Sequence, residues 1–265
     1  MKKEPKVSVI MGIYNCVETL GESIESIINQ TFQDFELIMC DDGSTDETYS
    51  VAYSYFQKYP TKIVLLKNER NQGLNYTLNK CLYVANGEYI ARMDGDDISL
   101  PDRFDIEVNF LDNNPKYAFV SSPMIYFDND GVFKVGVGTG EPDINSFPIS
   151  TPFCHAPCMI RKNVFDIVEG YTVDKKLLRV EDWHLWIKLY KNGFKGYMLN
   201  IPLYMMRDDK AAKSRRKLKY RFNEAYVSRL AVKLLNLPKW MYVYSLRPII
   251  IGLLPKSLYI KIHRR

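Results

Sequence analysis

The N-terminal part of the chain alternates between short apolar runs and amphipathic segments. Four runs are apolar along nearly their whole length, as in strands that are covered on both faces. They are residues 7–13, 35–40, 63–66 and 88–93. Between them, apolar residues recur at i, i+4, i+7 and i+8, which is one face of a helix. The clearest stripes are Leu20, Ile24, Ile27 and Ile28, and Leu74, Leu78, Cys81 and Leu82. This alternation predicts βαβ units, and therefore an α/β fold with a parallel sheet.

Polar clusters directly follow all four predicted strands. They are Tyr14, Asn15 and Glu18 after the first, Asp41 and Asp42 after the second, Arg70 after the third, and Asp94, Asp96 and Asp97 after the fourth. Ligands of open parallel sheets bind beyond the carboxyl ends of the strands. We therefore expect these residues to meet at one edge, although each acidic turn by itself is also ordinary loop chemistry.

Carboxylates that crowd one edge repel each other unless a cation lies among them. Carboxylate oxygens prefer hard divalent ions such as Mg²⁺ or Mn²⁺, which are commonly shared with substrate phosphates. A diphosphate bound by such a metal, with Arg70 assisting, would leave with its charge neutralised. The chain has neither a GxxxxGK[ST] loop nor a GxGxxG motif after the first strand, so a P-loop site and a dinucleotide oxidoreductase are disfavoured.

Charge is distributed unevenly along the 265 residues, whose net charge is +5. Residues 210–265 contain fifteen Lys or Arg and a single acid, Glu224, a balance of +14, so residues 1–209 carry −9. A basic tail favours a polyanionic partner. Because large aliphatic side chains accompany the basic ones, residues 238–265 predict contact with an anionic membrane surface. Two alternatives stay open: RNA, which is disfavoured because no RNA-binding motif is present, and packing of the tail on the catalytic domain.

The five cysteines show no disulfide spacing and are interpreted as reduced thiols. No signal-peptide pattern is visible, and no apolar stretch is long enough to span a bilayer. The sequence therefore predicts a cytoplasmic protein, peripheral on the inner face of the cell membrane. Residues 117–151 contain four glycines and are predicted to be rich in loops, a kind of segment in which acceptor specificity commonly lies.

Three segments resemble family 2 glycosyltransferases with the GT-A fold, in the order typical of that family. They are residues 7–48, which include CDDGSTDET, residues 68–104, which include ARMDGDD, and residues 181–193, EDWHLWIKLYKNG. The resemblance implies a mixed sheet flanked by helices. It also implies a catalytic domain over residues 1–208, with a nucleotide-sugar half (1–97) and an acceptor half (98–208), followed by a basic helical tail over 209–265.

The resemblance also implies roles for single residues. Asp41, with Asp42, would recognise the base or ribose of a nucleotide-sugar donor, and Tyr14, Asn15, Glu18 and Arg70 would line the same pocket. Asp94 would face the ribose or sugar and share the metal with Asp96. Arg207 would close over the diphosphate, with a lid at 208–216. The activity implied is inverting transfer of a hexose, from a UDP-hexose by expectation, to a saccharide acceptor on a polyprenyl diphosphate in cell-surface polysaccharide synthesis.

Inversion by single displacement needs one general base under the acceptor hydroxyl. The resemblance assigns this role to Asp182. The residues agree, because Leu185, Trp186 and Leu189 mark the inner face of a helix whose first turn holds Asp182, where the helix dipole favours an ionised carboxylate. A simple capping role for Glu181 and Asp182 fits the spacing equally well. Two other functions stay open: a nucleotidyltransferase and a non-catalytic nucleotide-sugar-binding scaffold.

Overall fold

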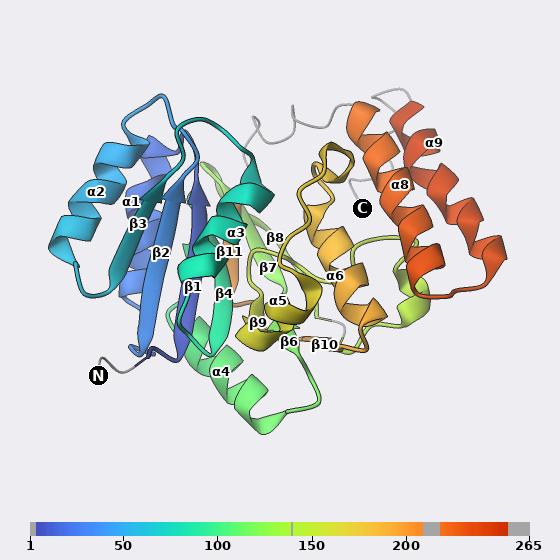
Figure 1. Cartoon of the computed structure of the whole chain (residues 1–265), viewed down its shortest axis with the longest axis horizontal. Coiled ribbons are helices and arrows are strands. Elements are labelled where there is room, and N and C mark those ends of the chain that lie inside the picture. The colour runs from blue at the N-terminus through green and yellow to red at the C-terminus, as the bar shows by residue number, and fades with distance from the viewer. Residues whose placement is uncertain (1–3, 139, 209–217, 254–265) are drawn as a thin grey trace. The chain divides into compact units, whose positions relative to one another are not determined.

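The computed structural model describes residues 4–138, 140–208 and 218–253 (Figure 1). The chain forms two compact units that interleave along the sequence. The first comprises residues 1–141, 153–171 and 194–209, and the second comprises 142–152, 172–193 and 210–265. The boundary expected after residue 208 stays a prediction, and residues 142–152 and 172–193 of the predicted catalytic domain group with residues 210–265. Most of the predicted lid at 208–216 and the last twelve positions of the tail, 254–265, lie outside the described residues.

A seven-stranded sheet, ordered β10-β6-β9-β4-β1-β2-β3, forms the centre of the first unit. Strands β1 to β4 are parallel neighbours, as expected from the alternating pattern, and β9 runs antiparallel to both β4 and β6. The strands are β1 (Val7–Ile13), β2 (Phe35–Asp41), β3 (Ile63–Lys67), β4 (Tyr89–Asp94), β6 (Phe119–Ser121), β9 (Met159–Arg161) and β10 (Gly196–Met198). The expected mixed sheet flanked by helices is therefore present.

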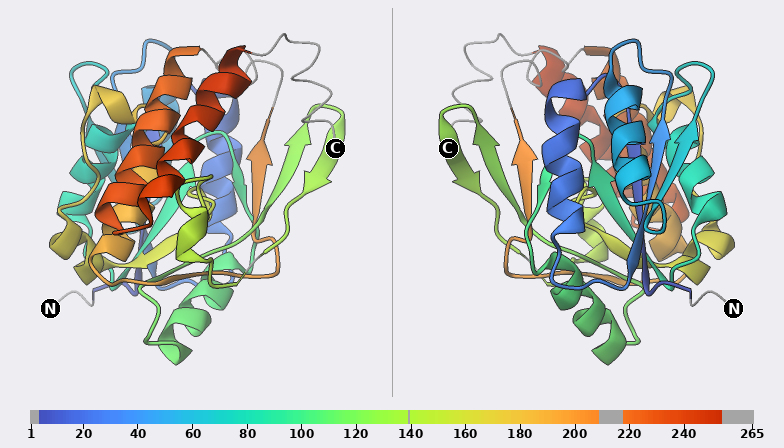
Figure 2. Two further views of the ribbon diagram at one scale, coloured as in Figure 1. Left: turned by 90° about the vertical axis from the view of Figure 1, so that its right-hand side faces the viewer. Right: turned by 90° about the vertical axis from the view of Figure 1, so that its left-hand side faces the viewer.

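Helices cover both faces of this sheet. Because the side chains of a strand alternate between the two faces, a single strand packs against helices on each of them. Val9 and Met11 of β1 join a core cluster with Leu20 and Ile24 of α1. Gly12, the residue after Met11, points to the other face and toward α3. Helices α1 and α2 lie side by side (Figure 2). The helices are α1 (Val17–Ile28), α2 (Thr48–Lys58), α3 (Leu74–Val84), α4 (Arg103–Asn113) and α5 (Lys162–Val168).

A second, four-stranded sheet is ordered β5-β11-β7-β8. It contains β5 (Ile98–Ser99), β7 (Met124–Asp128), β8 (Gly131–Val135) and β11 (Tyr204–Arg207). Antiparallel pairing of β11 with β5 brings residues 204–207 beside the turn that follows β4. The segment 117–151, predicted to be rich in loops, also contains β6, β7 and β8. Gly131 lies at the tip of the β7–β8 hairpin, with a φ of +113°. The other three glycines of the segment follow β8.

The second unit contains the described part of the basic tail. Its elements are η1 (Ile144–Ser146), η2 (Lys175–Leu177), α6 (Glu181–Lys191), α8 (Leu218–Leu234), η3 (Lys239–Leu246) and α9 (Arg247–Leu253). Ser228 of α8 donates to the Pro148 carbonyl at 2.6 Å, and Trp183 of α6 donates to the Phe147 carbonyl at 2.7 Å. Helix α8 therefore packs within this unit. Among the described residues, no helix is both long and apolar enough to cross a lipid bilayer.

Candidate active site

Asp42 joins the loops that follow β2 and β3. Its side chain is buried, and its Oδ1 accepts hydrogen bonds from the Gln72 amide and from Asn68 Nδ2, each at 2.8 Å. Its Oδ2 accepts the Gly73 amide at 2.9 Å. Both oxygens therefore hold the loop that carries Arg70. Sequence reasoning grouped Asp42 with the donor-binding residues and missed Asn68, whose only sequence signal is an amide directly after an apolar strand.

Asp41 lies at the end of β2 and is fully buried. Its two carboxylate oxygens each lie 3.3 Å from the Ser44 amide, which donates to them. The Asn15 side chain, in a residue with a φ of +47°, accepts from the Thr45 amide at 2.9 Å. The loops after β1 and β2 are thereby tied together, which places Asp41 and Asn15 at one edge of the sheet as expected.

Tyr14, Glu18 and Arg70 are exposed at the carboxyl-end loops of the sheet. Glu18 lies in the first turn of α1, where the helix dipole favours its negative charge. Arg70 approaches the DDG turn through its backbone, because a Cβ placed on Gly43 would lie 2.6 Å from the Arg70 carbonyl carbon. The predicted donor-pocket loops therefore meet in the first unit.

Gly43 allows this approach, and its φ of +71° is a conformation that side chains disfavour. We expect Gly43→Ala to destabilise the protein by about 2–4 kcal/mol, because left-handed strain adds to a backbone clash. The matched control is Gly193→Ala, where φ is +80° but nothing lies within 4 Å of an added Cβ. That variant should lose only about 1–2 kcal/mol. Urea unfolding measures both, and equal losses would contradict the close approach of the two loops.

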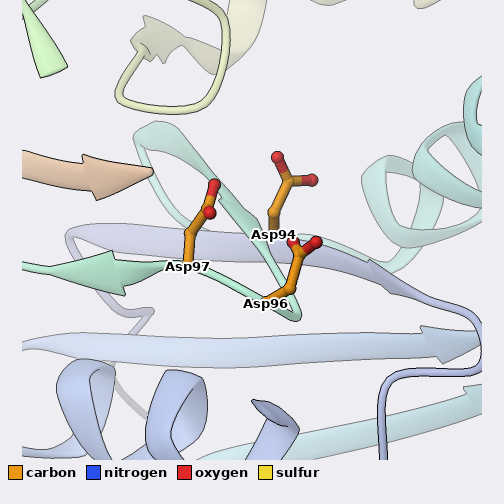
Figure 3. A group of neighbouring side chains, drawn as sticks. All are labelled: Asp94, Asp96 and Asp97. Carbon is orange, nitrogen blue, oxygen red and sulfur yellow. The ribbon is translucent and has the colours of Figure 1, made fainter. Parts of the chain in front are cut away.

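Three carboxylates project from the turn after β4 (Figure 3). Asp94, Asp96 and Asp97 each offer an oxygen, and these oxygens all lie within 4.8 Å of one another. Burial raises the pKa of the Asp97 carboxyl well above its usual range, and the neighbouring charges of Asp94 and Asp96 raise it further. A hard divalent cation would offset this repulsion, and an all-carboxylate donor set suits Mg²⁺ or Mn²⁺.

Gly95, in the middle of the turn, has no room for a side chain. A Cβ there would lie 2.9 Å from Cys16 Sγ and 3.2 Å from Ile13 Cγ2. Its carbonyl accepts the Thr19 hydroxyl at 3.0 Å. The turn therefore packs directly on the start of α1, which brings the carboxylates close to the loop after β1.

Strand β11 fixes the acidic turn from the other side. The Asp94 amide donates to the Tyr204 hydroxyl at 3.1 Å, and the Arg207 amide donates to Asp97 Oδ1 at 2.8 Å. Arg207 Nε also donates to the Asp96 carbonyl at 3.0 Å. One Asp97 oxygen is therefore engaged by β11, and the assignment of the metal to Asp94 and Asp96 stays a prediction.

The Arg207 guanidinium forms an ion pair with Glu22 of α1 at 2.5 Å and lies 4.6 Å from the centre of the Phe127 ring. Sequence reasoning assigned Arg207 to the diphosphate. In the structure this side chain braces the acidic turn against α1.

Arg92 is a site residue that sequence reasoning missed. It is buried in β4 and forms an ion pair with Asp94, two residues further along the same strand. Burial alone lowers the pKa of Arg92, but the Asp94 charge more than offsets this and raises it, so the guanidinium stays charged. Arg92 therefore orients the Asp94 carboxylate.

A second buried ion pair lies behind Arg92. Arg103 of α4 donates to the Arg92 carbonyl at 3.0 Å and to Glu107 at 3.1 Å. Burial raises the pKa of Glu107 to about 7, although Arg103 opposes the shift. This pair supports the strand that carries Asp94 and does not face the carboxylate turn.

Asp182 belongs to the second unit. It lies half-buried in the first turn of α6, and Leu185, Trp186 and Leu189 on the inner face of this helix are buried as expected. Nearby, burial lowers the pKa of His184 to about 4, so its imidazole is neutral at physiological pH. The position of Asp182 at a helix N-terminus is compatible with the predicted general base.

Comparison with known proteins identifies the family. Residues 8–167 match the family described as Glycosyl transferase family 2. EpsE of Bacillus subtilis (strain 168), a protein named as a glycosyltransferase, is 40% identical over 265 residues, covering 100% of this chain and 95% of EpsE. WfaP of Escherichia coli, named as a UDP-Glc:alpha-D-GlcNAc-diphosphoundecaprenol beta-1,3-glucosyltransferase, is 30% identical over 74% of this chain and 74% of its own length.

A solved structure gives the fold. The structure of S. aureus TarS 1-349 in complex with UDP-GlcNAc has a TM-score of 0.69 at 19% identity, covering 98% of this chain and 76% of that chain. This likeness confirms the expected GT-A fold. The family match and the similarity to EpsE show that the chain belongs to glycosyl transferase family 2 and is a glycosyltransferase.

Proposed function

We propose that this glycosyltransferase moves a hexose from a nucleoside-diphosphate sugar, most simply a UDP-hexose, to a hydroxyl of a saccharide acceptor, with inversion at the anomeric carbon. The observation that carries the proposal is the carboxylate turn of Asp94, Asp96 and Asp97, braced by β11 and placed at the same edge as the loops of Asp41 and Asn15. Metal-assisted departure of a diphosphate needs such a turn next to a nucleotide pocket.

In this proposal Asp96 and Asp94 hold Mn²⁺ or Mg²⁺, and the ion supplies charge neutralisation for the diphosphate. Asp41, Tyr14, Asn15, Glu18 and Arg70 contact the nucleotide. Asp42 acts on the pocket through the loop that it holds. Arg207 keeps the acidic turn in place and is available to the diphosphate if its ion pair with Glu22 opens.

The acceptor hydroxyl attacks the anomeric carbon from the face opposite the diphosphate. Asp182 accepts the hydroxyl proton as the new C–O bond forms, and the bond to the diphosphate oxygen breaks.

The acceptor in this proposal is a saccharide on a polyprenyl diphosphate, as the name of WfaP states for that relative. The biological role is cell-surface polysaccharide synthesis. A lipid-linked acceptor would place the enzyme on the cytoplasmic face of the cell membrane, held there through residues 238–265.

A panel of UDP-, GDP- and dTDP-sugars tests this function. The full chain with Mn²⁺ should release the nucleoside diphosphate from one or a few of them, and chelation with EDTA should stop the release. NMR of the transfer product to a synthetic lipid-linked saccharide should show the inverted anomer. Release of pyrophosphate from a nucleoside triphosphate instead would identify a nucleotidyltransferase, and donor binding without any turnover would identify a scaffold.

A further inference from the structure

Besides Tyr242, five large apolar side chains of the second unit are exposed to solvent on η3 and α9. Their exposed fractions range from 47% to 70%. They are Trp240, Val243, Leu246, Ile250 and Leu253, here called the apolar stripe. Contiguous exposed apolar surface of this kind marks an interaction site more often than isolated exposed residues do.

The helical periods place the stripe on one side of each helix. A 3₁₀-helix repeats every three residues, so positions 240, 243 and 246 of η3 are aligned. An α-helix aligns i, i+4 and i+7, so positions 246, 250 and 253 are aligned at and beyond the start of α9. The stripe therefore continues from one helix into the next.

The opposite side of the same segment is anchored. Met241, Ser245 and Pro248 are buried. Ser245 accepts a hydrogen bond from Arg229 Nε of α8 at 3.1 Å, and Arg247 donates to the Ile149 carbonyl at 2.9 Å. Contacts within the second unit thus fix which side chains face outward.

The charge around the stripe is positive. Lys239 and Arg247 of the segment are exposed. Glu224 is the one acid in residues 210–265, and it is already paired with Arg221 at 2.8 Å. The net positive charge of residues 210–265 can therefore attract an anionic surface. Each basic residue near such a surface adds to the attraction, and salt weakens it.

Two other occupants fit less well. A second copy of the chain would bring two strongly basic segments together, and their repulsion opposes association. RNA is bound through stacking on aromatic rings, whereas four of the five stripe residues are aliphatic. Aliphatic side chains with one Trp and flanking Lys and Arg suit the headgroup region of a bilayer.

We infer that the apolar stripe inserts into the headgroup region of an anionic membrane, with Lys239 at the phosphates. The inference deepens the proposed function, since it gives the surface by which the enzyme would reach a lipid-linked acceptor. Removal of residues 238–265 would not test it cleanly, because that truncation would delete the buried Met241 and Ser245 as well.

Tryptophan fluorescence can read insertion directly. The chain has three tryptophans, and Trp183 and Trp186 are buried while Trp240 is exposed. With the full chain, phosphatidylglycerol vesicles carrying brominated acyl chains should quench the Trp240 emission and shift the remaining emission to the blue. Pure phosphatidylcholine vesicles should do neither, and added salt should reduce the effect. Binding without quenching would mean that only charge is involved and would contradict insertion.

The decisive variant is Val243→Asp with Ile250→Asp. Removing one aliphatic side chain from the membrane should lower the partition coefficient roughly tenfold. The double variant should therefore bind anionic vesicles about 100-fold more weakly in flotation. The matched control is Ile167→Asp with Val173→Asp, whose exposed fractions of 57% and 59% resemble those of the stripe. The control should float like the parent chain. Equal flotation of both variants would overturn the inference, as would a dimer of the parent chain, seen by ultracentrifugation, that the stripe variant abolishes.

Donor hydrolysis without vesicles separates this inference from the proposed function. Both double variants should retain the parent rate, since none of the four residues belongs to the proposed donor or base residues. If the parent chain binds vesicles through the stripe but hydrolyses no nucleotide sugar, only the proposed function fails. If it hydrolyses donor but the stripe variant still floats, only the inference fails.

Discussion

Asp182→Asn should lower sugar transfer by about 10²–10⁴-fold while leaving donor affinity nearly unchanged. An amide of the same shape cannot accept the proton of the acceptor hydroxyl, but it keeps the size and most of the packing of the side chain. Single-turnover assays with a lipid-linked saccharide measure the transfer step, and calorimetry with the donor measures binding.

The neighbouring Glu181→Gln is the matched control, because both carboxylates lie half-buried in the first turn of α6. Each substitution removes one negative charge from the same helix N-terminus. A general loss of helix stability would therefore affect both variants alike. If Glu181→Gln causes the larger fall in transfer, the base is Glu181, and if Asp182→Asn abolishes donor binding, Asp182 is a binding residue.

Asp96→Asn should remove most of the metal-dependent turnover, because a neutral amide is a poor ligand for a hard cation among carboxylates. The half-saturating Mn²⁺ concentration should rise at least tenfold, since one charged ligand is lost. Turnover titrated with Mn²⁺, together with electron paramagnetic resonance of the bound ion, reports both effects.

The control for this variant is Asp102→Asn. Asp102 is exposed, precedes α4, and makes no side-chain capping hydrogen bond. The same charge change should leave Mn²⁺ dependence unaltered there. Parent turnover of Asp96→Asn at low Mn²⁺ would remove Asp96 from the metal site, and the assignment would then pass to Asp94 and Asp97.

Periodicity predicted β1 to β4 to within a residue, and α1 and α3 along most of their length, because local apolar spacing determines which segments become buried. The grouping of the acidic turn with the loops after β1 and β2 followed from parallel topology alone. These features depend on short-range pattern, which a sequence displays directly.

Other parts depend on pairing between distant segments, which a sequence does not display. Arg92 lies in an apolar run and gives no sign that it pairs with Asp94. Asp41 and Asp42 look alike in sequence, yet both carboxylate oxygens of Asp42 accept hydrogen bonds from the loop after β3. The grouping of α6 with the C-terminal helices could not be read from linear composition either, because it arises from tertiary contacts.

The bracing of the acidic turn by β11 has a consequence for how the protein matures during translation. The hydrogen bonds from Asp94 to Tyr204 and from Arg207 to Asp97 each join residues 110 positions apart. At a synthesis rate of about 5–20 residues per second, roughly 5–20 seconds separate the appearance of the turn from that of its brace. Strands β1 to β4 pair only with one another and with β9 (Met159–Arg161), so all of their partners are synthesised before then. A ribosome-bound chain can therefore pair β1 to β4 well before its acidic turn is braced, whereas the edge strand β10 and the brace on β11 are added together near the end of synthesis.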